Sequence, residues 1–220
     1  VAVVARERLI ELGADINKAQ DNGATPLFMA AQTGYEVVVR TLIEAGADIN
    51  KAIDDGMTPL YMAAQVGHEK VVRALIELGA DINKAQDDGA TPLIMAAQTG
   101  HETVVRALIE LGADVNKASN EGGTLLVAAQ AGHEMVVRAL IELGADVNKA
   151  GGIGATALLI AAYFGHEAMV RALIGAGADV NKARRDNGAT PLSVSMTRVS
   201  NVARGNHAAI VHILIDAGAM

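Results

Sequence analysis

One short motif, Thr-Pro-Leu followed closely by Ala-Ala, recurs along the 220-residue chain at a spacing of 33 residues. It begins at Thr25, Thr58 and Thr91, and it continues with small slips at Thr124, Thr156 and Thr190. A second motif, Gly-Ala-Asp-(Ile/Val)-Asn-Lys-Ala, keeps the same phase and ends at Ala19, Ala52, Ala85, Ala118, Ala150 and Ala183. Two ladders in phase indicate an array of stacked repeats, in which chain length counts units rather than the size of one core.

Composition narrows the kind of core and of site that the array can build. Apolar residues make up 51% of the chain but aromatic residues only 2%, so the core must consist of Ala, Val, Leu, Ile and Met, which suits closely packed helices. The absence of cysteine excludes disulfides and thiolate metal sites. No apolar run approaches the roughly 18 residues of a membrane span, and no signal-peptide pattern opens the chain. We therefore expect a cytoplasmic protein without membrane contact.

Charge is spread unevenly along the chain. Residues 1–180 hold 13 Lys and Arg against 23 Asp and Glu, whereas residues 181–220 hold 5 against 2. The acidic body should repel nucleic acid and anionic membranes. The C-terminal segment is the one region to which that expectation does not extend.

A single repeat, taken at residues 50–82, predicts a turn and two helices. Thr58 caps a short first helix, with Pro59 at its first position and Gly67 as a left-handed cap at its end. A second helix is expected from about His68 to Leu78, with a buried stripe at Val71, Val72, Leu75 and Ile76. An extended Gly-Ala-Asp-x-Asn link then leads into the next turn.

The outer side of each second helix carries a Glu-Arg-Glu triplet with a spacing of four residues, as in Glu69, Arg73 and Glu77. Each arginine can pair with the glutamate one turn before it and the one a turn after it. Exposed pairs of this kind contribute only about 0.3–0.5 kcal/mol each, so we interpret them as a solvated outer face.

These units resemble the ankyrin repeat, whose signature combines T-P-L-H-x-A-A, a Gly-His before the second helix, and G-A-D-x-N after it. The resemblance covers nearly the whole chain and implies an α-solenoid, mainly α with short β-hairpin or turn fingers, built as an array of paired antiparallel helices. The expected division is a partial N-terminal repeat with only a second helix (1–16), repeats 1 to 5 (17–49, 50–82, 83–115, 116–147 and 148–180), and a variant sixth repeat with an insertion (181–220). We expect these to form one continuous domain.

Several positions depart from the family signature. The histidine of T-P-L-H is replaced by Phe28, Tyr61, Ile94, Leu159 and Ser193, with Val127 nearby in repeat 4. In the family this histidine couples neighbouring turns, so its loss should weaken that coupling unless apolar contacts replace it. Repeat 4 lacks one residue, which we place in its turn, and it has lost the proline. The glycine-rich fifth turn, residues 151–154, should be mobile. The insertion between Met196 and Asn206 predicts a longer first helix, with a bulging loop as the alternative.

The two ends of the chain lack the polar surface of capping repeats. We therefore expect a fragment of a longer array, which is a monomer with end-to-end stacking as a possibility.

Residues that could carry chemistry are few. Five of the six histidines, at His68, His101, His133, His166 and His207, stand at the Gly-His position of the signature and are interpreted as structural. Stacked repeats would hold them about 10 Å apart, too far for one metal ion. Adjacent aspartates in the turns point apart in water, and no nucleophile motif is present. We expect no cofactor, no metal and no enzymatic activity.

The resemblance instead implies a scaffold that binds another protein through its concave surface of fingers and first helices. The candidate contact residues are Phe28, Gln32, Ile53, Asp54, Met57, Tyr61, Gln65, Asp87, Gln98, Tyr163, Phe164, Arg184 and Arg185. Tyr163 and Phe164 stand out because they are adjacent aromatic residues, which are typical interface anchors. The alternative is that one of them packs against the longer helix of the sixth repeat.

Two further hypotheses remain open. Arg184 and Arg185, with Arg198 and Arg204, could bind an acidic segment, a phosphate group or nucleic acid, or they could form a solvated edge, which we slightly prefer. The resemblance also implies possible asparagine hydroxylation at the repeated positions Asn17, Asn50, Asn83, Asn116, Asn148 and Asn181.

Overall fold

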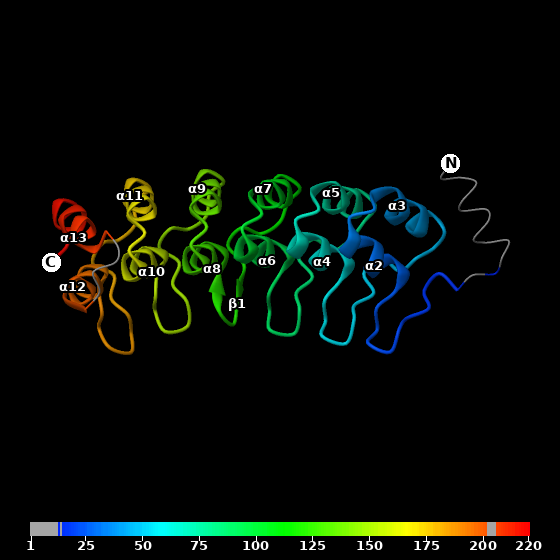
Figure 1. Ribbon diagram of the computed structural model, residues 1–220, viewed down its shortest axis with the longest axis horizontal. Coiled ribbons are helices and arrows are strands. Elements are labelled where there is room, and N and C mark those ends of the chain that lie inside the picture. The colour runs from blue at the N-terminus through cyan, green and yellow to red at the C-terminus, as the bar shows by residue number, and fades with distance from the viewer. Residues whose placement is uncertain (1–12, 14, 202–205) are drawn as a thin grey trace. The chain divides into compact units, whose positions relative to one another are not determined.

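The computed structural model describes residues 13, 15–201 and 206–220, in which twelve helices and two short strands are found (Figure 1). The predicted N-terminal half repeat, with its helix at residues 2–12, lies outside the described residues. The helices are α2 (Pro26–Thr33), α3 (Glu36–Glu44), α4 (Pro59–Val66), α5 (Glu69–Glu77), α6 (Pro92–Thr99), α7 (Glu102–Glu110), α8 (Thr124–Ala131), α9 (Glu134–Glu142), α10 (Ala157–Phe164), α11 (Glu167–Gly175), α12 (Pro191–Asn201) and α13 (His207–Asp216). The strands are β1 (Ala118–Ser119) and β2 (Gly122–Gly123).

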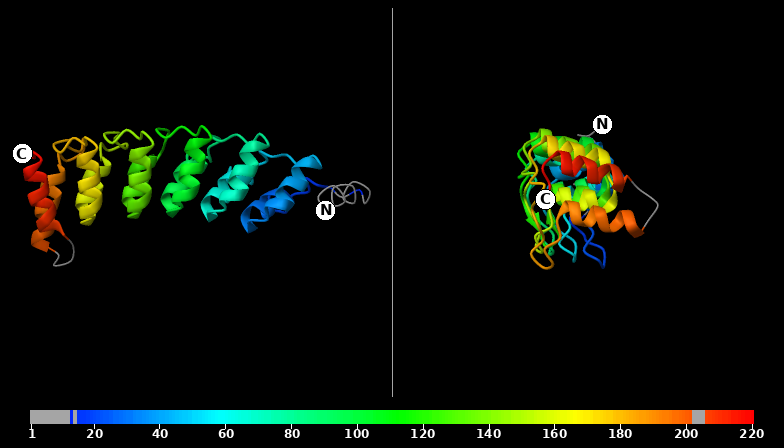
Figure 2. Two further views of the ribbon diagram at one scale, coloured as in Figure 1. Left: turned by 90° about the horizontal axis from the view of Figure 1, so that it is seen from above. Right: turned by 90° about the vertical axis from the view of Figure 1, so that its left-hand side faces the viewer.

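The chain divides into two compact units. Unit 1 takes the described residues up to Ala96 together with Thr103–Asp114, and unit 2 takes Ala97–Glu102 and the described residues from Val115 onward. Within each unit, first helices pack on first helices, as α2 on α4 and α8 on α10, and second helices pack on second helices, as α3 on α5 and α9 on α11. Figure 2 shows the helices of unit 2 side by side, with their connecting loops gathered at one end.

The first helices begin and end where the sequence predicts. The hydroxyl of Thr58 accepts a hydrogen bond from the Tyr61 N–H at 3.1 Å, and Pro59 takes the first helical position. Gly67 ends the helix with φ at +89°, in the left-handed region where a side chain would be strained. The Thr25 and Thr156 hydroxyls cap α2 and α10 in the same way. Local capping chemistry therefore sets the bounds of these helices.

The second helix of repeat 2 is one residue shorter at each end than predicted, running from Glu69 to Glu77. Its buried side chains are Val71, Val72, Ala74 and Leu75, whereas the predicted Ile76 is only half-buried. The correction follows from packing, because α5 contacts both α4 and α3. Two neighbours bury a wider face than a single stripe, and they take in Ala74.

The Glu-Arg-Glu triplets pair differently from the prediction. Arg40 bonds to Glu36 one turn earlier at 2.9 Å, but its second partner is Glu77 of the next repeat, also at 2.9 Å. Arg73 likewise bonds to Glu69 and to Glu110 of repeat 3. The prediction of a partner one turn later in the same helix was wrong, because parallel stacking of second helices brings the next repeat closer. Hydrogen bonds to Glu77 and Glu36 raise the pKa of Arg40 above its ordinary value.

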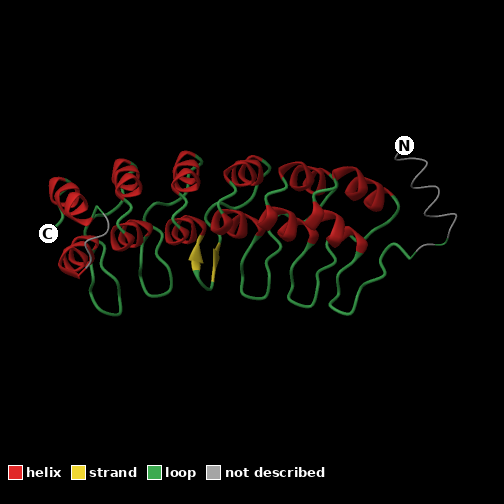
Figure 3. Cartoon of the chain, viewed as in Figure 1, coloured by secondary structure: helices red, strands yellow, loops and turns green. Residues whose placement is uncertain are grey.

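The fingers are the loops that precede the first helices, at residues 18–24, 51–57, 84–90, 117–122, 149–155 and 182–189. Only the fourth contains strands among the described residues, with Ala118 paired to Gly123 and Ser119 to Gly122 around a two-residue turn (Figure 3). In the second finger the Ile53 N–H donates to the Met57 carbonyl, so its turn has three residues, one more than the turn of the fourth finger. The predicted placement of the repeat 4 deletion in its turn is confirmed.

The deletion shifts the cap of α8. Gly123 becomes the N-cap and Thr124 takes the place that proline holds in other repeats. The Thr124 hydroxyl is buried and has no hydrogen-bond partner. Leu126, rather than Val127, consequently occupies the position of the replaced signature histidine. In repeat 6, α12 has eleven residues against eight in α4, so a longer first helix is confirmed as far as Asn201. Residues 202–205, where the alternative of a loop would fall, lie outside the described residues.

Candidate functional site

A hollow of about 240 Å³ opens in unit 2 between the fingers and the first helices α8 and α10. Its walls come from repeats 4, 5 and 6, the three irregular repeats of the sequence. It is lined by Glu121, Leu126, Gln130, Gly151, Gly152, Ile153, Ala155, Leu159, Ile160, Tyr163, Phe164 and Arg184. Three predicted contact residues, Tyr163, Phe164 and Arg184, thus meet the glycine-rich fifth finger around one concavity.

The floor of the hollow is apolar. Leu126 and Leu159 are 6% and 1% exposed, so each shows only an edge to the opening. The fifth finger leaves room for Leu126 because a Cβ on Gly151 would lie only 2.8 Å from the Leu126 Cδ2 atom. The predicted mobility of this finger stays a prediction. Its glycines Gly151 and Gly152 line the hollow and place no side chain in it.

Tyr163 and Phe164 form one rim and remain 38% and 48% exposed. Their rings meet edge to face, with centroids 5.0 Å apart and an interplanar angle of 89°. The Arg198 guanidinium of α12 lies 4.0 Å from the centroid of the Tyr163 ring, within cation–π range. Packing against the longer helix of repeat 6 therefore does involve Tyr163, yet both rings keep substantial open surface.

The sixth repeat supplies positive charge beside the hollow. Arg184 lines it and is bound to Asp186, with Nε to Oδ1 at 3.0 Å and Nη2 to Oδ2 at 2.6 Å. This hydrogen-bonded pair lowers the pKa of the Asp186 carboxyl below its ordinary value. The backbone N–H of Arg185 donates to the Ile153 carbonyl at 3.0 Å, which ties the sixth finger to the fifth. The Arg204 of the predicted basic cluster lies outside the described residues.

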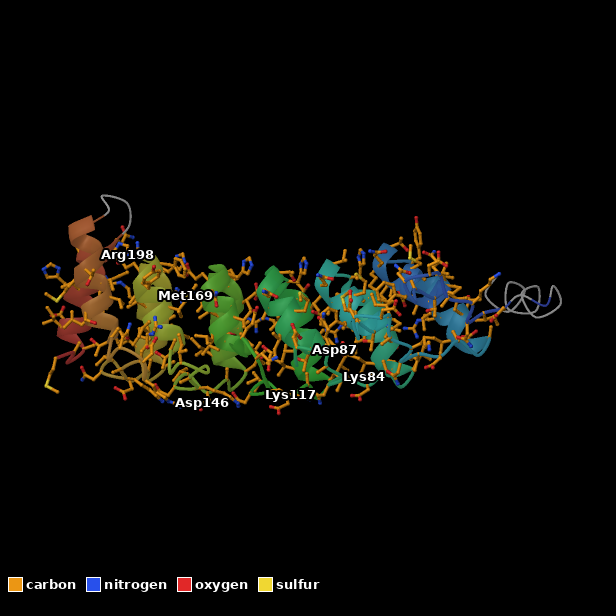
Figure 4. All side chains as sticks on the ribbon, turned by 90° about the horizontal axis from the view of Figure 1, so that it is seen from below. Lys84, Asp87, Lys117, Asp146, Met169 and Arg198 are labelled. Carbon is orange, nitrogen blue, oxygen red and sulfur yellow. The ribbon has the colours of Figure 1, made fainter. Side chains whose placement is uncertain are left out.

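Figure 4 shows where three charged residues of unit 2 lie. Lys117 and Asp146 lie along the edge of the loops, whereas Arg198 lies at the far end of α12. The cation over Tyr163 is consequently well separated from Asp146.

In unit 1 the structure corrects two of the candidates. Phe28 and Tyr61 are 4% and 1% exposed, so they cannot meet a partner. Ile53 and Met57 are half-buried and pack against the cluster of Phe28 and Met62. Phe28 stands at the position of the signature histidine and makes apolar contacts with Met62 and the next finger. Sequence reasoning took two buried aromatic residues for part of a binding surface, whereas Ile53 and Met57 stay candidate contact residues.

The remaining candidates of the regular repeats lie at the surface. Gln32, Asp54, Asp87 and Gln98 are exposed, and Gln65 is half-buried. None of these five lines the hollow in unit 2. Sequence reasoning missed Leu126, Ile160 and Glu121 of the hollow, although two consecutive glycines facing a helix were a usable signal.

The histidines of the Gly-His motif are structural, as predicted, in the three repeats where their bonds are seen. The Nε2 atoms of His68, His133 and His207 donate to the carbonyl oxygens of Gln32, Gln98 and Tyr163, at 3.0, 3.0 and 3.1 Å. The preceding repeat meets His68 with Gly34, where a Cβ would lie 2.7 Å from the ring and φ is +80°. The His68 ring thus links repeats 1 and 2 through a contact that leaves no room for a side chain on Gly34.

The repeated asparagines form a second ladder between repeats. The Oδ1 atom of Asn50 accepts from the Asp81 N–H at 3.0 Å, and Asn148 does the same for Asp179 at 2.7 Å. The Asn148 Nδ2 atom also donates to the Gly177 carbonyl at 3.1 Å. Equivalent bonds to the next repeat or chain end are made by Asn17, Asn83, Asn116 and Asn181. Hydroxylation at these positions stays a prediction, which the intact mass of the protein would test.

Among the residues that the structure describes, no group of three or more His, Cys, Asp and Glu side chains could hold a metal ion. No helix in the same part of the chain has the length and apolar character to cross a membrane.

Comparisons with known proteins agree with this architecture. The family profile described as "Ankyrin repeats (3 copies)" matches residues 5–86 and 83–151, and the one described as "Ankyrin repeat" matches residues 153–185. No curated protein sequence matches the chain. The solved ankyrin repeat domain of human ASB11 is 24% identical with a TM-score of 0.83, covering 96% of this chain and 92% of that one. The ankyrin repeat domain of Bcl-3, a member of the IkappaB family, is 28% identical with a TM-score of 0.82, covering 96% and 91%.

Ankyrin repeat domains are generally protein–protein interaction modules and non-catalytic binding scaffolds. The two family profiles together span most of the sequence, and the stacked helix pairs with projecting fingers match the fold of that family. The chain belongs to the ankyrin-repeat family.

Proposed function

We propose that this chain recognises a partner protein over the fingers and first helices of unit 2, with the hollow as the centre of the contact, and performs no chemistry. The observation that carries the proposal is the pair Tyr163 and Phe164, which stays exposed at the rim of an apolar hollow. Large aromatic side chains beside a pocket are the residues that most often supply binding energy at protein interfaces. In unit 1, Gln32, Asp54 and Asp87 stay candidate contact residues.

The size of the hollow favours a protein segment over a small-molecule ligand. Ligand pockets commonly enclose about 300–1,000 Å³ and surround most of their ligand. The hollow, at about 240 Å³, is smaller and is open to the surrounding surface of helices and fingers. It has room for a large side chain from a segment that continues across that surface.

The proposal is tested by selecting binders from a random peptide display library with the whole chain as bait. Selected peptides are then measured against wild type, the double variant Tyr163→Ala/Phe164→Ala, and the control Met135→Ala. Met135 is 59% exposed on α9 and does not line the hollow. We expect the double variant to lose at least about tenfold in affinity, since hot-spot truncations cost 2 kcal/mol or more, and the control to bind like wild type.

Two outcomes would count against this site. Selected peptides that bind the double variant as well as wild type would place recognition elsewhere on the array. A library that yields no binder to the wild-type chain would remove peptide recognition as its function. Circular dichroism of each variant shows that a loss of binding is not a loss of fold.

A further inference from the structure

The hollow combines an apolar floor with a cationic border, and this combination specifies the partner more closely. Resting on the proposed function, we infer that the bound segment is an acidic stretch of a partner protein carrying one large apolar side chain. The apolar side chain enters the hollow of unit 2, and flanking carboxylates meet Arg185 and Arg198 of the sixth repeat.

The apolar part of the inference follows from the lining. Leu126, Leu159, Ile160 and Ala155 face the opening together with the two exposed rings. A leucine, methionine or phenylalanine placed there would lose its contact with water without leaving a polar atom unbonded. Burial of one such side chain accounts for about tenfold to a hundredfold in affinity.

The cationic part follows from how the arginines are used in the two units. Arg40 and Arg73 of unit 1 each hold two carboxylates, so their charges are already compensated. In unit 2, Arg184 shares its charge with Asp186. Within the described residues, Arg185 and Arg198 have no carboxylate partner, and both adjoin the hollow. The Arg185 N–H donates to the carbonyl of Ile153, which lines the hollow, and the Arg198 guanidinium lies over the ring of Tyr163.

The surrounding charge sets the orientation of an acidic segment. Glu121 of the fourth finger lines the side of the hollow contributed by repeat 4 and would repel carboxylates there. Residues 1–180 carry ten more acidic than basic side chains, whereas residues 181–220 carry three more basic than acidic ones. Carboxylates of the segment therefore face repeat 6, and the apolar side chain points toward repeats 4 and 5.

A protein segment fits these observations better than a nucleic acid. A phosphate chain has no large aliphatic group for the apolar floor, and its continuous charge would cross the acidic repeats that precede repeat 6. A peptide can confine its charge to one flank. The experiment therefore also includes a measurement of nucleic-acid binding.

The experiment uses three fluorescent peptides of one length and measures anisotropy with the full chain. The first has a central leucine with aspartate and glutamate on one flank and uncharged residues on the other. The second replaces those acids by asparagine and glutamine, and the third replaces the leucine by serine. We expect the amide peptide to bind about three- to tenfold more weakly, because partly exposed ion pairs are modest. We expect the serine peptide to bind at least about tenfold more weakly. The preference for the acidic peptide should shrink as salt rises.

Protein variants locate the contact. Arg185→Gln/Arg198→Gln should lower the affinity for the acidic peptide about three- to tenfold and leave the amide peptide unchanged. Arg185→Lys/Arg198→Lys should restore much of the preference, which a purely structural role would not predict. Arg171→Gln is the matched control, because that arginine is 59% exposed on α11, pairs with Glu167 and lies outside the hollow.

The outcomes separate this inference from the proposed function. Equal binding of the acidic and amide peptides, both dependent on Tyr163 and Phe164, would overturn the acidic segment and leave recognition at the hollow standing. A labelled single-stranded oligonucleotide that binds through Arg185 and Arg198 while the acidic peptide does not would also overturn it. If the acidic peptide binds the wild-type chain and the Tyr163→Ala/Phe164→Ala variant equally, the hollow is the wrong site and both ideas fail.

Discussion

Repeat 2 in unit 1 and repeat 5 in unit 2 place the same kind of side chain in opposite surroundings. Tyr61 stands near the start of its first helix and is 1% exposed, whereas Tyr163 stands near the end of its first helix and is 38% exposed. The start of a first helix faces the neighbouring finger and first helix, which close over it. The end of α10 borders the hollow, and Arg198 of α12 covers Tyr163 only in part. The two tyrosines therefore differ both in their position within the repeat and in what the neighbouring repeat places over them.

The irregular repeats differ from the regular ones in a second respect. In repeat 2 the polar groups at the start of α4 are used, as when the Thr58 hydroxyl caps the helix. In repeat 4 the shortened finger moves Thr124 one place into α8 and leaves its hydroxyl buried without a partner. The regular repeats thus keep the threonine cap, which repeat 5 also keeps through Thr156, whereas repeat 4 has lost it. The following predictions measure that difference, beginning with the largest effect.

The two tyrosines should respond very differently to truncation. Tyr61→Ala removes a fully buried ring and should lower the free energy of unfolding by about 3–5 kcal/mol. Tyr163→Ala gives up only a partly exposed ring and its contact with Arg198, and it should cost less than about 1 kcal/mol. Urea unfolding followed by circular dichroism compares the two. Equal losses would mean that Tyr163 belongs to the core and not to a recognition surface.

The sequence predicted the fold through features that act within a few residues. Thr58 and Pro59 start a helix and Gly67 ends it through local bonding alone. The repeat period and the helix ends could therefore be predicted from the sequence. The side chains at the interfaces between repeats were less predictable, because they depend on what the next repeat presents. The spacing within one helix favoured a bond from Arg40 to Glu44, and stacking supplied Glu77 instead.

The candidate site shows the same limit. Tyr163 and Phe164 were conspicuous by type, and both stay partly exposed at the end of α10. Phe28 and Tyr61 were equally conspicuous but lie under their neighbours. Burial of a single residue in a repeat array is a property of two adjacent repeats, and the pattern of one repeat cannot decide it.

The helix caps should give opposite results in the two kinds of repeat. Thr58→Ala removes a cap and should cost about 1 kcal/mol. Thr124→Val keeps the shape but removes a buried hydroxyl without a partner, so the free energy of unfolding should stay the same or rise by up to about 1 kcal/mol. Thermal and urea unfolding of both variants measure the effects. A clear loss for Thr124→Val would show that its hydroxyl is hydrogen-bonded in solution.

The ladder of arginines between repeats offers the smallest and most selective comparison. Arg138 stands 37 residues before Gly175, the separation at which Arg40 meets Glu77, but glycine offers it no carboxylate. An open hollow of about 250 Å³ borders both residues, and a Cβ on Gly175 would meet no atom within 4 Å.

Gly175→Glu should therefore extend the ladder into unit 2, and Gly175→Gln is the matched control. Both replace glycine in a helix and should stabilise by up to about 1 kcal/mol. The glutamate should add a further 0.3–0.5 kcal/mol, approximately, through a pair with Arg138. Because the pair is exposed, the extra stabilisation by glutamate should disappear at about 1 M salt, where the Debye length falls to roughly 3 Å. The stabilisation that both variants share, from replacing glycine in a helix, should persist at that salt concentration. An increment that survives high salt, or one of equal size in an Arg138→Gln background, would show that the glutamate acts without Arg138.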